Sequence, residues 1–326
     1  MLQEKIEHLE QSVREDYSNT TGILVRKDGK TVYERYFNGF AAENAGHVYS
    51  VTKSVFSILI GIAIDLGRIR SVDETVLSFF PDYAVELEET AIQNITIRHL
   101  LTMTAPYKYD TEPYEAFFTS PNPIFTALDY LGGDGPIGAF RYSAIGGTHI
   151  LSGILARATG MSTFDFATKR LFKPLGIEDP RSIVLHSAEE HFSVMNDRMT
   201  RGWVVDPQGN NMASWGLFLT PDEMAKIGQL YHNRGAWDGK QIVSAEWIAE
   251  STREQCRCIE WGNLGYGYLW WAIDEDSYAA LGDGGNVIYV NHKNNMVIAL
   301  AAQFLPDAAD RIGWIKQMIE PMFEND

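Results

Sequence analysis

The sequence has few cysteines, and their spacing suits neither a cross-link nor a metal site. Only two of the 326 residues are cysteine, and Arg257 alone separates Cys256 from Cys258. That spacing is awkward for a disulfide, and no Cys/His cluster accompanies it to bind zinc. We therefore expect two free thiols in a reducing compartment, which favours the cytoplasm, and we expect no metal and no cofactor.

Positive charge is also scarce. The chain has 27 lysines and arginines against 43 aspartates and glutamates, which gives a formal net charge of −16. Without a basic stripe, binding to the phosphate backbone of a nucleic acid has no electrostatic basis. The same acidity gives no attraction to anionic membranes. These absences argue against nucleic-acid and membrane partners and leave a small molecule as the expected one.

No apolar run is long enough to span a bilayer. The most apolar stretch, "SVFSILIGIAIDLG" (54–67), is short and carries Asp65 near its end. The N-terminal "MLQEKIEHLEQSVREDY" is charged and helix-like, with no apolar core and no small-residue cleavage site, so it does not read as a secretory signal. Both observations favour a cytoplasmic protein with an ordinary core, in line with its 45% hydrophobic residues.

The patterning predicts an α+β fold. "GILVRKDGKTVYERYF" alternates apolar and polar residues around Asp28-Gly29, which indicates a hairpin, and residues 50–66 read as a buried helix. Residues 71–235 are helical and loop-rich, with Thr163 and Thr220 as expected N-caps. Strands return near the C-terminus in "GYGYLWWAID", "SYAALGDGG", "NVIYVNH" and "MVIALAAQF", before a closing amphipathic helix.

Strands at both ends of the chain with helices between them predict one mostly antiparallel sheet with a helical insertion. We expect residues 1–70 and 236–326 to form an α/β lobe around the sheet. Residues 71–235 would form a mostly helical lobe, and the active site would lie between the two.

The tetrapeptide Ser50-Val51-Thr52-Lys53 is the first candidate for chemistry. Residues i and i+3 share a helix face, so the Lys53 amine can reach the Ser50 hydroxyl. Ser50 would sit in the first helical turn, where free N–H groups favour developing negative charge. Alternatively, Ser50 caps the helix and Lys53 extends to solvent. The tetrapeptide alone leaves both readings open.

Two further segments are candidates. Tyr142 lies in a loop before a helix in "GPIGAFRYSAIGGTHILSGIL", where a phenol beside a lysine can relay protons; alternatively it is one half-buried tyrosine among 15. "AALGDGGN" (279–286) places three glycines in a strand context, which often marks a close approach of a ligand to the backbone. Its N–H groups could stabilise an oxyanion, or the segment is simply a bulge or loop.

Other motifs carry less. "GDGPIG" (133–138) matches G-x-G-x-x-G but follows a helical segment and not a strand, which argues against dinucleotide binding. "HSAEEH" (186–191) lacks metal-ligand spacing. The chain has no G-x-S-x-G elbow, which disfavours an α/β-hydrolase triad. His47 could act as a base for Ser50, but a structural role is the simpler expectation.

In this order, the pieces resemble the serine β-lactamase and penicillin-binding-protein-like hydrolases, over nearly the whole chain from about residue 20. The similarity is closest to the class C β-lactamase-related branch, which includes carboxylesterases and the 6-aminohexanoate-dimer hydrolase. It is carried by "YSVTKS", which matches the Ser-x-x-Lys motif, by "ITIRHLLTMT", "FRYSAIGGTHILSGILARATGMSTFDFATKRLFKPLGI", "SWGLFLTPDEMAKIGQLYHNRG" and "GYGYLWW". The resemblance implies a β-lactamase/transpeptidase-like fold, with an antiparallel sheet flanked by helices, and it favours Ser50 as a nucleophile.

By that resemblance, Ser50 would be acylated, Lys53 would take its proton, and Tyr142 would relay protons to the leaving group and to the deacylating water. The backbone N–H groups of Ser50 and Asp283 would form the oxyanion hole. The same carry-over places substrate contacts at Ala144, Ala280, Gly282, Gly284 and Asn286.

The chain departs from the family pattern at two motifs. Tyr-x-Asn reads Tyr142-Ser143-Ala144, so an amide that would hold an acylamino group is missing. Lys-Thr-Gly reads Ala280-Leu281-Gly282, so the cation that would bind a substrate carboxylate is missing, and a carboxylate without its cation is disfavoured. "ALGDGGN" instead resembles the Gly-x-Gly-Gly-Gln form of esterase and amide-hydrolase relatives.

The sequence therefore predicts a serine hydrolase that cleaves a small ester or amide through an acyl-enzyme. The alternatives are a β-lactamase or penicillin-binding D,D-peptidase-like protein and, from a different class, a non-catalytic ligand-binding module on the same fold. The aromatic loop "YKYDTEPYEAFFTSPNP" (107–123) is expected either to wall the substrate pocket or to pack as an ordinary loop.

Overall fold

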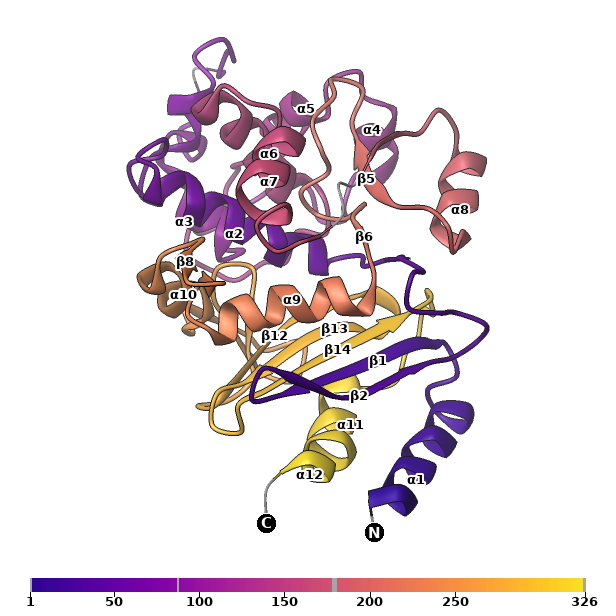
Figure 1. The fold of residues 1–326 in the computed structure, drawn as a ribbon. Helices are drawn as coiled ribbons and strands as arrows, with labels where there is room; N and C mark the ends of the chain where they lie inside the picture. The colour runs from indigo at the N-terminus through magenta and orange to yellow at the C-terminus, as the bar shows by residue number, and fades with distance from the viewer. Residues whose placement is uncertain (1, 87, 178–180, 325–326) are drawn as a thin grey trace.

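The computed structural model describes residues 2–86, 88–177 and 181–324 (Figure 1). Its helices are α1 (Leu2–Glu15), α2 (Val51–Asp65), α3 (Ile97–Leu101), α4 (Tyr114–Thr119), α5 (Pro123–Tyr130), α6 (Gly146–Thr159), α7 (Thr163–Ala167), α8 (Ala188–Asn196), α9 (Pro221–His232), α10 (Ala245–Thr252), α11 (Arg311–Trp314) and α12 (Glu320–Phe323).

Its strands are β1 (Thr20–Lys27), β2 (Lys30–Tyr36), β3 (Gly46–His47), β4 (Arg181–Val184), β5 (Gly202–Val205), β6 (Phe218–Leu219), β7 (Ala236–Trp237), β8 (Lys240–Gln241), β9 (Cys256–Cys258), β10 (Leu264–Tyr266), β11 (Trp271–Ala272), β12 (Ser277–Gly282), β13 (Asn286–Asn291) and β14 (Met296–Ala302).

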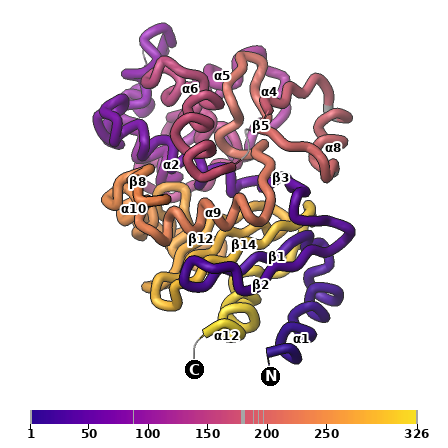
Figure 2. The backbone as a smooth tube through the Cα atoms, viewed as in Figure 1, coloured from indigo at the N-terminus to yellow at the C-terminus, as the bar shows by residue number. Residues whose placement is uncertain are grey.

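One antiparallel sheet joins the two ends of the chain. Within the described residues its order is β2-β1-β14-β13-β12-β11-β10-β9, and the N-terminal hairpin pairs with β14. Figure 2 shows the indigo β1 beside the yellow-orange β14, with both termini at the same end of the molecule. The hairpin turn has positive φ at Asp28 and Gly29, as its sequence predicted. The prediction of an α+β fold with a sheet built from both termini is confirmed.

Both faces of the sheet are covered, and β14 shows how the sequence achieves this. Val297, Ala299 and Ala301 belong to the core between the sheet and the helices above it, whereas Met296, Ile298 and Leu300 belong to a second core. Alternate side chains of a strand point to opposite faces, so an almost wholly apolar strand fills both cores. In Figure 1, α9 lies across one face, and α1 with α11 and α12 lies on the other.

Helix α9 packs closely on the sheet because Gly228 offers no side chain there. A Cβ at Gly228 would lie 2.5 Å from Val297 Cγ1 and 2.8 Å from Ile288 Cγ2. Thr220 caps this helix by accepting from the Glu223 N–H, and Glu223 accepts in return from the Thr220 N–H. The predicted division of the chain into lobes at residues 70 and 235 stays a prediction. Helix α9 belongs by sequence to the predicted helical lobe, residues 71–235, but it lies on the sheet.

Helices α3 to α8 form a helical lobe above α9 (Figure 1). Helix α2 is buried between this lobe and the sheet, with every residue from Val51 to Ala63 buried, as its apolar sequence predicted. No helix in residues 2–86, 88–177 and 181–324 is long and apolar enough to cross a membrane.

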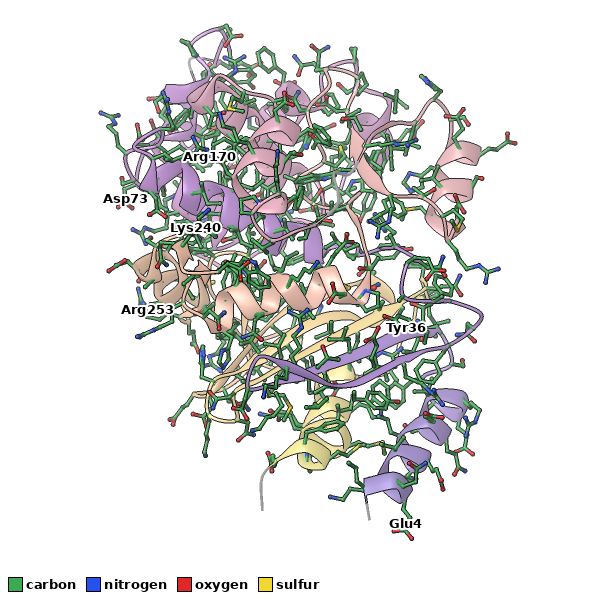
Figure 3. The ribbon with its side chains drawn as sticks, viewed as in Figure 1. Glu4, Tyr36, Asp73, Arg170, Lys240 and Arg253 are labelled. Carbon is green, nitrogen blue, oxygen red and sulfur yellow. The ribbon has the colours of Figure 1, made fainter. Side chains whose placement is uncertain are left out.

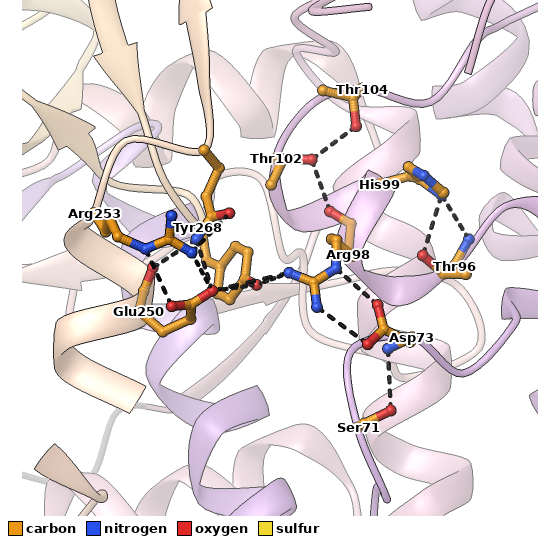
Figure 4. A network of polar contacts seen from close by, with 11 residues as sticks. Ser71, Asp73, Thr96, Arg98, His99, Thr102, Thr104, Glu250, Arg253 and Tyr268 are labelled. Atoms are coloured by element: carbon orange, nitrogen blue, oxygen red, sulfur yellow. Dashed lines mark hydrogen bonds and ion pairs between the residues drawn. The ribbon is translucent and has the colours of Figure 1, made fainter. Parts of the chain in front are cut away.

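A polar network ties the helical lobe to the sheet lobe on one side (Figure 4). Arg98 of α3 donates to Asp73 at 2.7 Å and to the hydroxyl of Tyr268, and Tyr268 donates to Glu250 of α10. Figure 3 places Asp73 and Arg253, a second partner of Glu250, on the same side of the molecule. The network joins segments far apart in the sequence and helps hold the two lobes in register.

Candidate active site

Ser50 stands at the start of α2, facing a cleft. The preceding Tyr49 has a positive φ of 48°, which is uncommon for a bulky residue and turns the chain sharply into the helix. Ser50 occupies the N-cap position, but its side chain makes no capping hydrogen bond. The capping alternative is therefore wrong, because the hydroxyl is not used by the helix.

Lys53 does not extend to solvent. Its side chain is only 2% exposed, and its Nζ lies 2.9 Å from Ser50 Oγ, as the helical i, i+3 spacing predicted. The amine also donates to the backbone carbonyls of Ala144 at 2.9 Å and Ser214 at 3.2 Å. These carbonyls come from the segment before α6 and from the segment before β6, so three distant parts of the chain hold one amine.

Tyr142 lies on the same side of Ser50 as the amine. Lys53 Nζ is 5.1 Å from the centroid of its ring, and both Ser50 and Tyr142 line the cleft. The ring packs against Trp261 at 4.7 Å and against Trp271 at 6.3 Å. Its hydroxyl makes no hydrogen bond to any residue that the structure describes. The phenol is thus held by aromatic packing and free to bond a substrate.

Gly282 brings the end of β12 against the start of α2. A Cβ at Gly282 would lie 2.3 Å from the Val48 carbonyl oxygen and 3.2 Å from the Ser50 nitrogen. The glycines of this segment predicted either a close approach of a ligand or a simple bulge or loop, and at Gly282 the structure shows a close approach of the chain's own backbone. It sets Asp283, the first residue of the turn Asp283–Gly285, beside Ser50.

The Ser50 N–H is free for a ligand, because within the described residues it has no hydrogen-bond acceptor. Strand β11 pairs only with Tyr278 and Ala279 of β12, so in the described structure no strand covers that side of Ala280 to Gly282. The open strand edge and the helix start therefore meet at the cleft, an arrangement in which two backbone N–H groups can point at one oxygen.

The cleft has a volume of about 520 Å³ and is largely aromatic. Its described lining is His47, Tyr49, Ser50, Tyr114, Phe118, Tyr142, Ala144, Ile145, His191, Met195, Ser214, Trp215, Trp261, Trp271, Leu281, Gly282 and Asp283. This set contains one carboxylate and no lysine or arginine. The missing Lys-Thr-Gly cation is therefore not replaced by another lysine or by an arginine among these residues.

The negative charge of Asp283 acts on the aromatic groups around it. Burial, and then Asp283, raise the pKa of Tyr49 to about 12. Burial, Glu112 and Asp283 raise the pKa of Tyr114 as well. The cleft is thus apolar with a negative bias, which disfavours an anionic group beside Ser50.

His47 is a structural residue with respect to Ser50. Its Nε2 accepts a hydrogen bond from the Gly216 N–H at 2.8 Å, and the ring is buried against Tyr49 and Phe218. Burial, with a smaller contribution from His191, lowers the pKa of His47 well below its usual value. The nitrogen that could accept a proton is already occupied, which excludes His47 as the base for Ser50 in this arrangement.

The predicted site residues divide into two groups. Ala144, Gly282 and Asp283 line the cleft with Ser50 and Tyr142. Ala280 is completely buried in the core between the sheet and the helices above it. Gly284 and Asn286 lie at a different cavity, and the Asn286 amide bonds the backbone of Asp283 and Ala302. These last three residues, Ala280, Gly284 and Asn286, are not part of the lining around Ser50.

Part of the 107–123 loop walls the cleft, through Tyr114 and Phe118. The same loop contributes Glu112, whose Oε1 accepts from the Ala144 N–H at 2.6 Å. Since the Ala144 carbonyl accepts from Lys53, the loop braces the peptide that holds the amine. Sequence reasoning missed Glu112 and the Ser214 carbonyl, because no motif marks either contact.

A family model described as "Beta-lactamase" matches residues 7–320. The chain belongs to the beta-lactamase family. This family includes hydrolases, and its fold matches the antiparallel sheet with a helical lobe seen here.

Among relatives of this beta-lactamase family member is a 6-aminohexanoate-dimer hydrolase of Paenarthrobacter ureafaciens, 22% identical over 336 aligned positions that cover 95% of this chain and 78% of the relative. A family VIII carboxylesterase structure superposes with a TM-score of 0.74 at 16% identity, covering 99% and 95% of the two chains. The octameric penicillin-binding protein homologue from Pyrococcus abyssi gives 0.71 at 21% identity, covering 94% and 74%. At these identities the solved structures show a shared fold.

The described residues contain no group of three or more His, Cys, Asp or Glu side chains that could hold a metal ion.

Proposed function

We propose that this protein cleaves a small ester or amide through an acyl-enzyme on Ser50. The observation that carries the proposal is the buried amine of Lys53, held between the Ser50 hydroxyl and two backbone carbonyls. A neutral amine has two N–H donors for the two carbonyls and one lone pair, which then points at the Ser50 hydroxyl. This is the geometry in which a lysine accepts a serine proton.

In the acylation step, Lys53 Nζ takes the proton of Ser50 as Oγ forms a bond to the substrate carbonyl carbon. The carbonyl oxygen becomes an oxyanion, and the N–H groups of Ser50 and Asp283 stabilise it. Removing one such donor typically reduces turnover by about 100- to 1,000-fold. The contact of Gly282 with the backbone of α2 supports this role, because it fixes the spacing between the two donors.

Tyr142 gives its phenolic proton to the leaving oxygen or nitrogen as the tetrahedral intermediate collapses, and Lys53 returns a proton to the phenol. A water molecule then attacks the acyl-enzyme with the same groups acting in reverse, and Ser50 is regenerated. The free Tyr142 hydroxyl and its place beside the Lys53 amine support this relay.

The substrate class follows from the charges of the cleft. The described lining has no lysine or arginine to pair with a substrate carboxylate, and Asp283 would repel it. Penicillins and D-alanine peptides both carry such a carboxylate, so neutral esters and amides fit better. The aromatic lining suits apolar substrate parts. The carboxylesterase and amide-hydrolase relatives lend the same support.

The test is pre-steady-state release of nitrophenolate from excess p-nitrophenyl butyrate. The wild-type protein should give a burst close to one equivalent followed by steady turnover, and Ser50→Ala should lose both phases. Ser57→Ala is the matched control, since Ser57 is a serine buried in the same helix and is not among the residues that line the cleft. Equal slow release by wild type and Ser50→Ala would refute Ser50 as the nucleophile.

The alternatives give different results in the same experiment. A chromogenic cephalosporin turned over faster than the ester would favour the β-lactamase reading, for which the penicillin-binding-protein-like relatives give some support. Stoichiometric binding of either compound without turnover would favour a non-catalytic binding module.

We also propose that the protein works in the cytoplasm. Cys256 and Cys258 are both free thiols, and burial, with Glu254 and Cys258 nearby, raises the pKa of the Cys256 thiol to about 12. A pair of free thiols suits a reducing compartment.

A further inference from the structure

One part of the cleft wall carries polar groups that have no partner. His47 Nδ1, Ser214 Oγ and Trp215 Nε1 are buried and make no hydrogen bond to any described residue. All three side chains belong to residues that line the Ser50 cleft. Most buried polar groups are hydrogen-bonded, and an unpaired one costs about 1–3 kcal/mol. Three in one wall of one cleft indicate a site for a missing partner.

Two of the three groups can only donate. The Gly216 N–H donates to His47 Nε2, so the proton of the neutral imidazole is on Nδ1. The His47 ring is neutral because burial lowers its pKa well below the usual value. The indole of Trp215 has an N–H donor and no acceptor. The Ser214 hydroxyl can donate or accept, so an oxygen acceptor is a suitable partner for each of the three groups.

The position of this wall selects the part of the substrate that it meets. In the proposed mechanism Tyr142 protonates the leaving group, so the leaving group lies beside Tyr142 and its ring partners Trp261 and Trp271. The His47 ring instead packs against Trp215 at 5.9 Å, and the Ser214 carbonyl accepts from Lys53. Trp215 also packs against Phe118 and His191, and none of its ring partners is a ring partner of Tyr142. We therefore assign this second wall to the acyl part of the substrate.

We propose that His47, Ser214 and Trp215 form an acceptor subsite that binds an oxygen in the acyl part of the substrate, such as an ether, hydroxyl or second carbonyl oxygen. The inference rests on the proposed function, because it assigns the two sides of the cleft from the role of Tyr142. The subsite supplies hydrogen-bond donors in a chain that has alanine at 144, where the related motif has asparagine.

The test compares two esters that differ by one atom in the acyl chain. In p-nitrophenyl methoxyacetate an ether oxygen replaces a methylene of p-nitrophenyl butyrate, so size and leaving group are the same. The quantity measured is the ratio of kcat/KM for the methoxyacetate to kcat/KM for the butyrate. The two esters differ in intrinsic reactivity, but that difference cancels when the ratio of a variant is divided by the wild-type ratio.

Trp215→Phe removes the indole N–H and keeps an aromatic ring, and it should lower this ratio about fivefold, the value of one neutral hydrogen bond. Trp261→Phe is the matched control: it makes the same change at the Tyr142 side of the cleft and should leave the ratio within about twofold of wild type. If Trp215→Phe does not fold, Ser214→Ala is the second variant. It removes the Ser214 hydroxyl from the subsite and should lower the ratio, while the backbone carbonyl of residue 214 still accepts from Lys53.

An unchanged ratio in the folded variant would overturn the subsite and would mean that water satisfies these donors. That result would leave the proposed function intact, because hydrolysis would still depend on Ser50. Hydrolysis of both esters by Ser50→Ala would instead refute the proposed function itself.

Discussion

Replacing Gly282 by alanine should separate the chemistry of the cleft from the stability of the fold. Gly282 has φ −136° and ψ 151°, an extended conformation that alanine adopts without strain. The difficulty is space, because the added Cβ would lie 2.3 Å from the Val48 carbonyl oxygen. To reach ordinary van der Waals contact, β12 and the start of α2 must move apart by about 1 Å.

That movement falls between the two proposed oxyanion donors. The same Cβ would lie 3.2 Å from the Ser50 nitrogen, and Asp283 is the next residue of the chain. A misplacement of about 1 Å in a catalytic array reduces the rate about 100-fold, which corresponds to about 2.7 kcal/mol of transition-state stabilisation. Overpacking should cost about 1–3 kcal/mol of stability, which a protein of ordinary stability survives. We therefore expect a folded variant with kcat/KM about 100-fold below wild type.

The assay is stopped-flow hydrolysis of p-nitrophenyl butyrate, with thermal unfolding measured on the same samples. Gly46→Ala is the matched control, since it lies only four residues before Ser50 and its Cβ would meet no atom within 4 Å. It should keep wild-type kcat/KM. A folded Gly282→Ala variant within about threefold of wild-type kcat/KM would refute the reasoning, because a 1 Å shift between the two donors could not then leave the rate unchanged.

Lys53→Met should reduce the acylation burst rate by at least about 100-fold in rapid-mixing experiments, and a normal burst would exclude Lys53 as the base. Tyr142→Phe should slow an alkyl ester more than a p-nitrophenyl ester, because nitrophenolate leaves without a proton; equal slowing of both esters would contradict the proton relay. Asp283→Asn should improve kcat/KM for a p-nitrophenyl ester with an anionic acyl group relative to the butyrate, and no change would show that the Asp283 charge does not act on substrate. The pKa of His47 lies below the 6.5 of the unfolded chain, so its contribution to stability is complete above pH 6.5 and is lost as the pH falls below it. Between pH 6.5 and 5.5 the wild-type free energy of unfolding should fall by up to about 1 kcal/mol relative to His47→Gln in urea titrations, and parallel curves would argue against a buried neutral ring.

Local patterns predicted the elements that local physics controls. The hairpin at Asp28-Gly29, the buried helix after Ser50 and the cap at Thr220 each depend on a few neighbouring residues, and each is confirmed. The predicted cap at Thr163 is wrong by one residue, since Ser162 accepts from the Asp165 N–H. Serine and threonine are both good N-caps, so residue type alone does not choose between Ser162 and Thr163. The helix begins at Thr163 because the Ser162 hydroxyl reaches the Asp165 N–H.

Contacts that join distant segments could not be predicted in the same way. Lys53 is held by the carbonyls of Ala144 and Ser214, 91 and 161 residues along the chain, and a backbone carbonyl leaves no trace in the residue type. Asn286 shows the reverse error, in which a motif suggested a substrate contact that the fold uses for itself. The motif placed it among substrate contacts, but the end of β14 runs beside it and takes up its amide.

The difference between backbone contacts and side-chain contacts also suggests how such a cleft could change its substrate. The atoms proposed for the chemistry are one amine, one phenol, one hydroxyl and two backbone N–H groups, and their positions depend on packed backbone such as the contact of Gly282 with α2. The groups that choose a substrate are side chains on separate segments of the wall. The proposed reacting atoms therefore do not depend on the missing asparagine and lysine side chains, and the unpaired donors at His47 and Trp215 are the groups that we propose to contact the acyl part. Ser214 and Asp283 serve both parts of this proposal, but through different atoms: the backbone acts in the chemistry and the side chain meets the substrate.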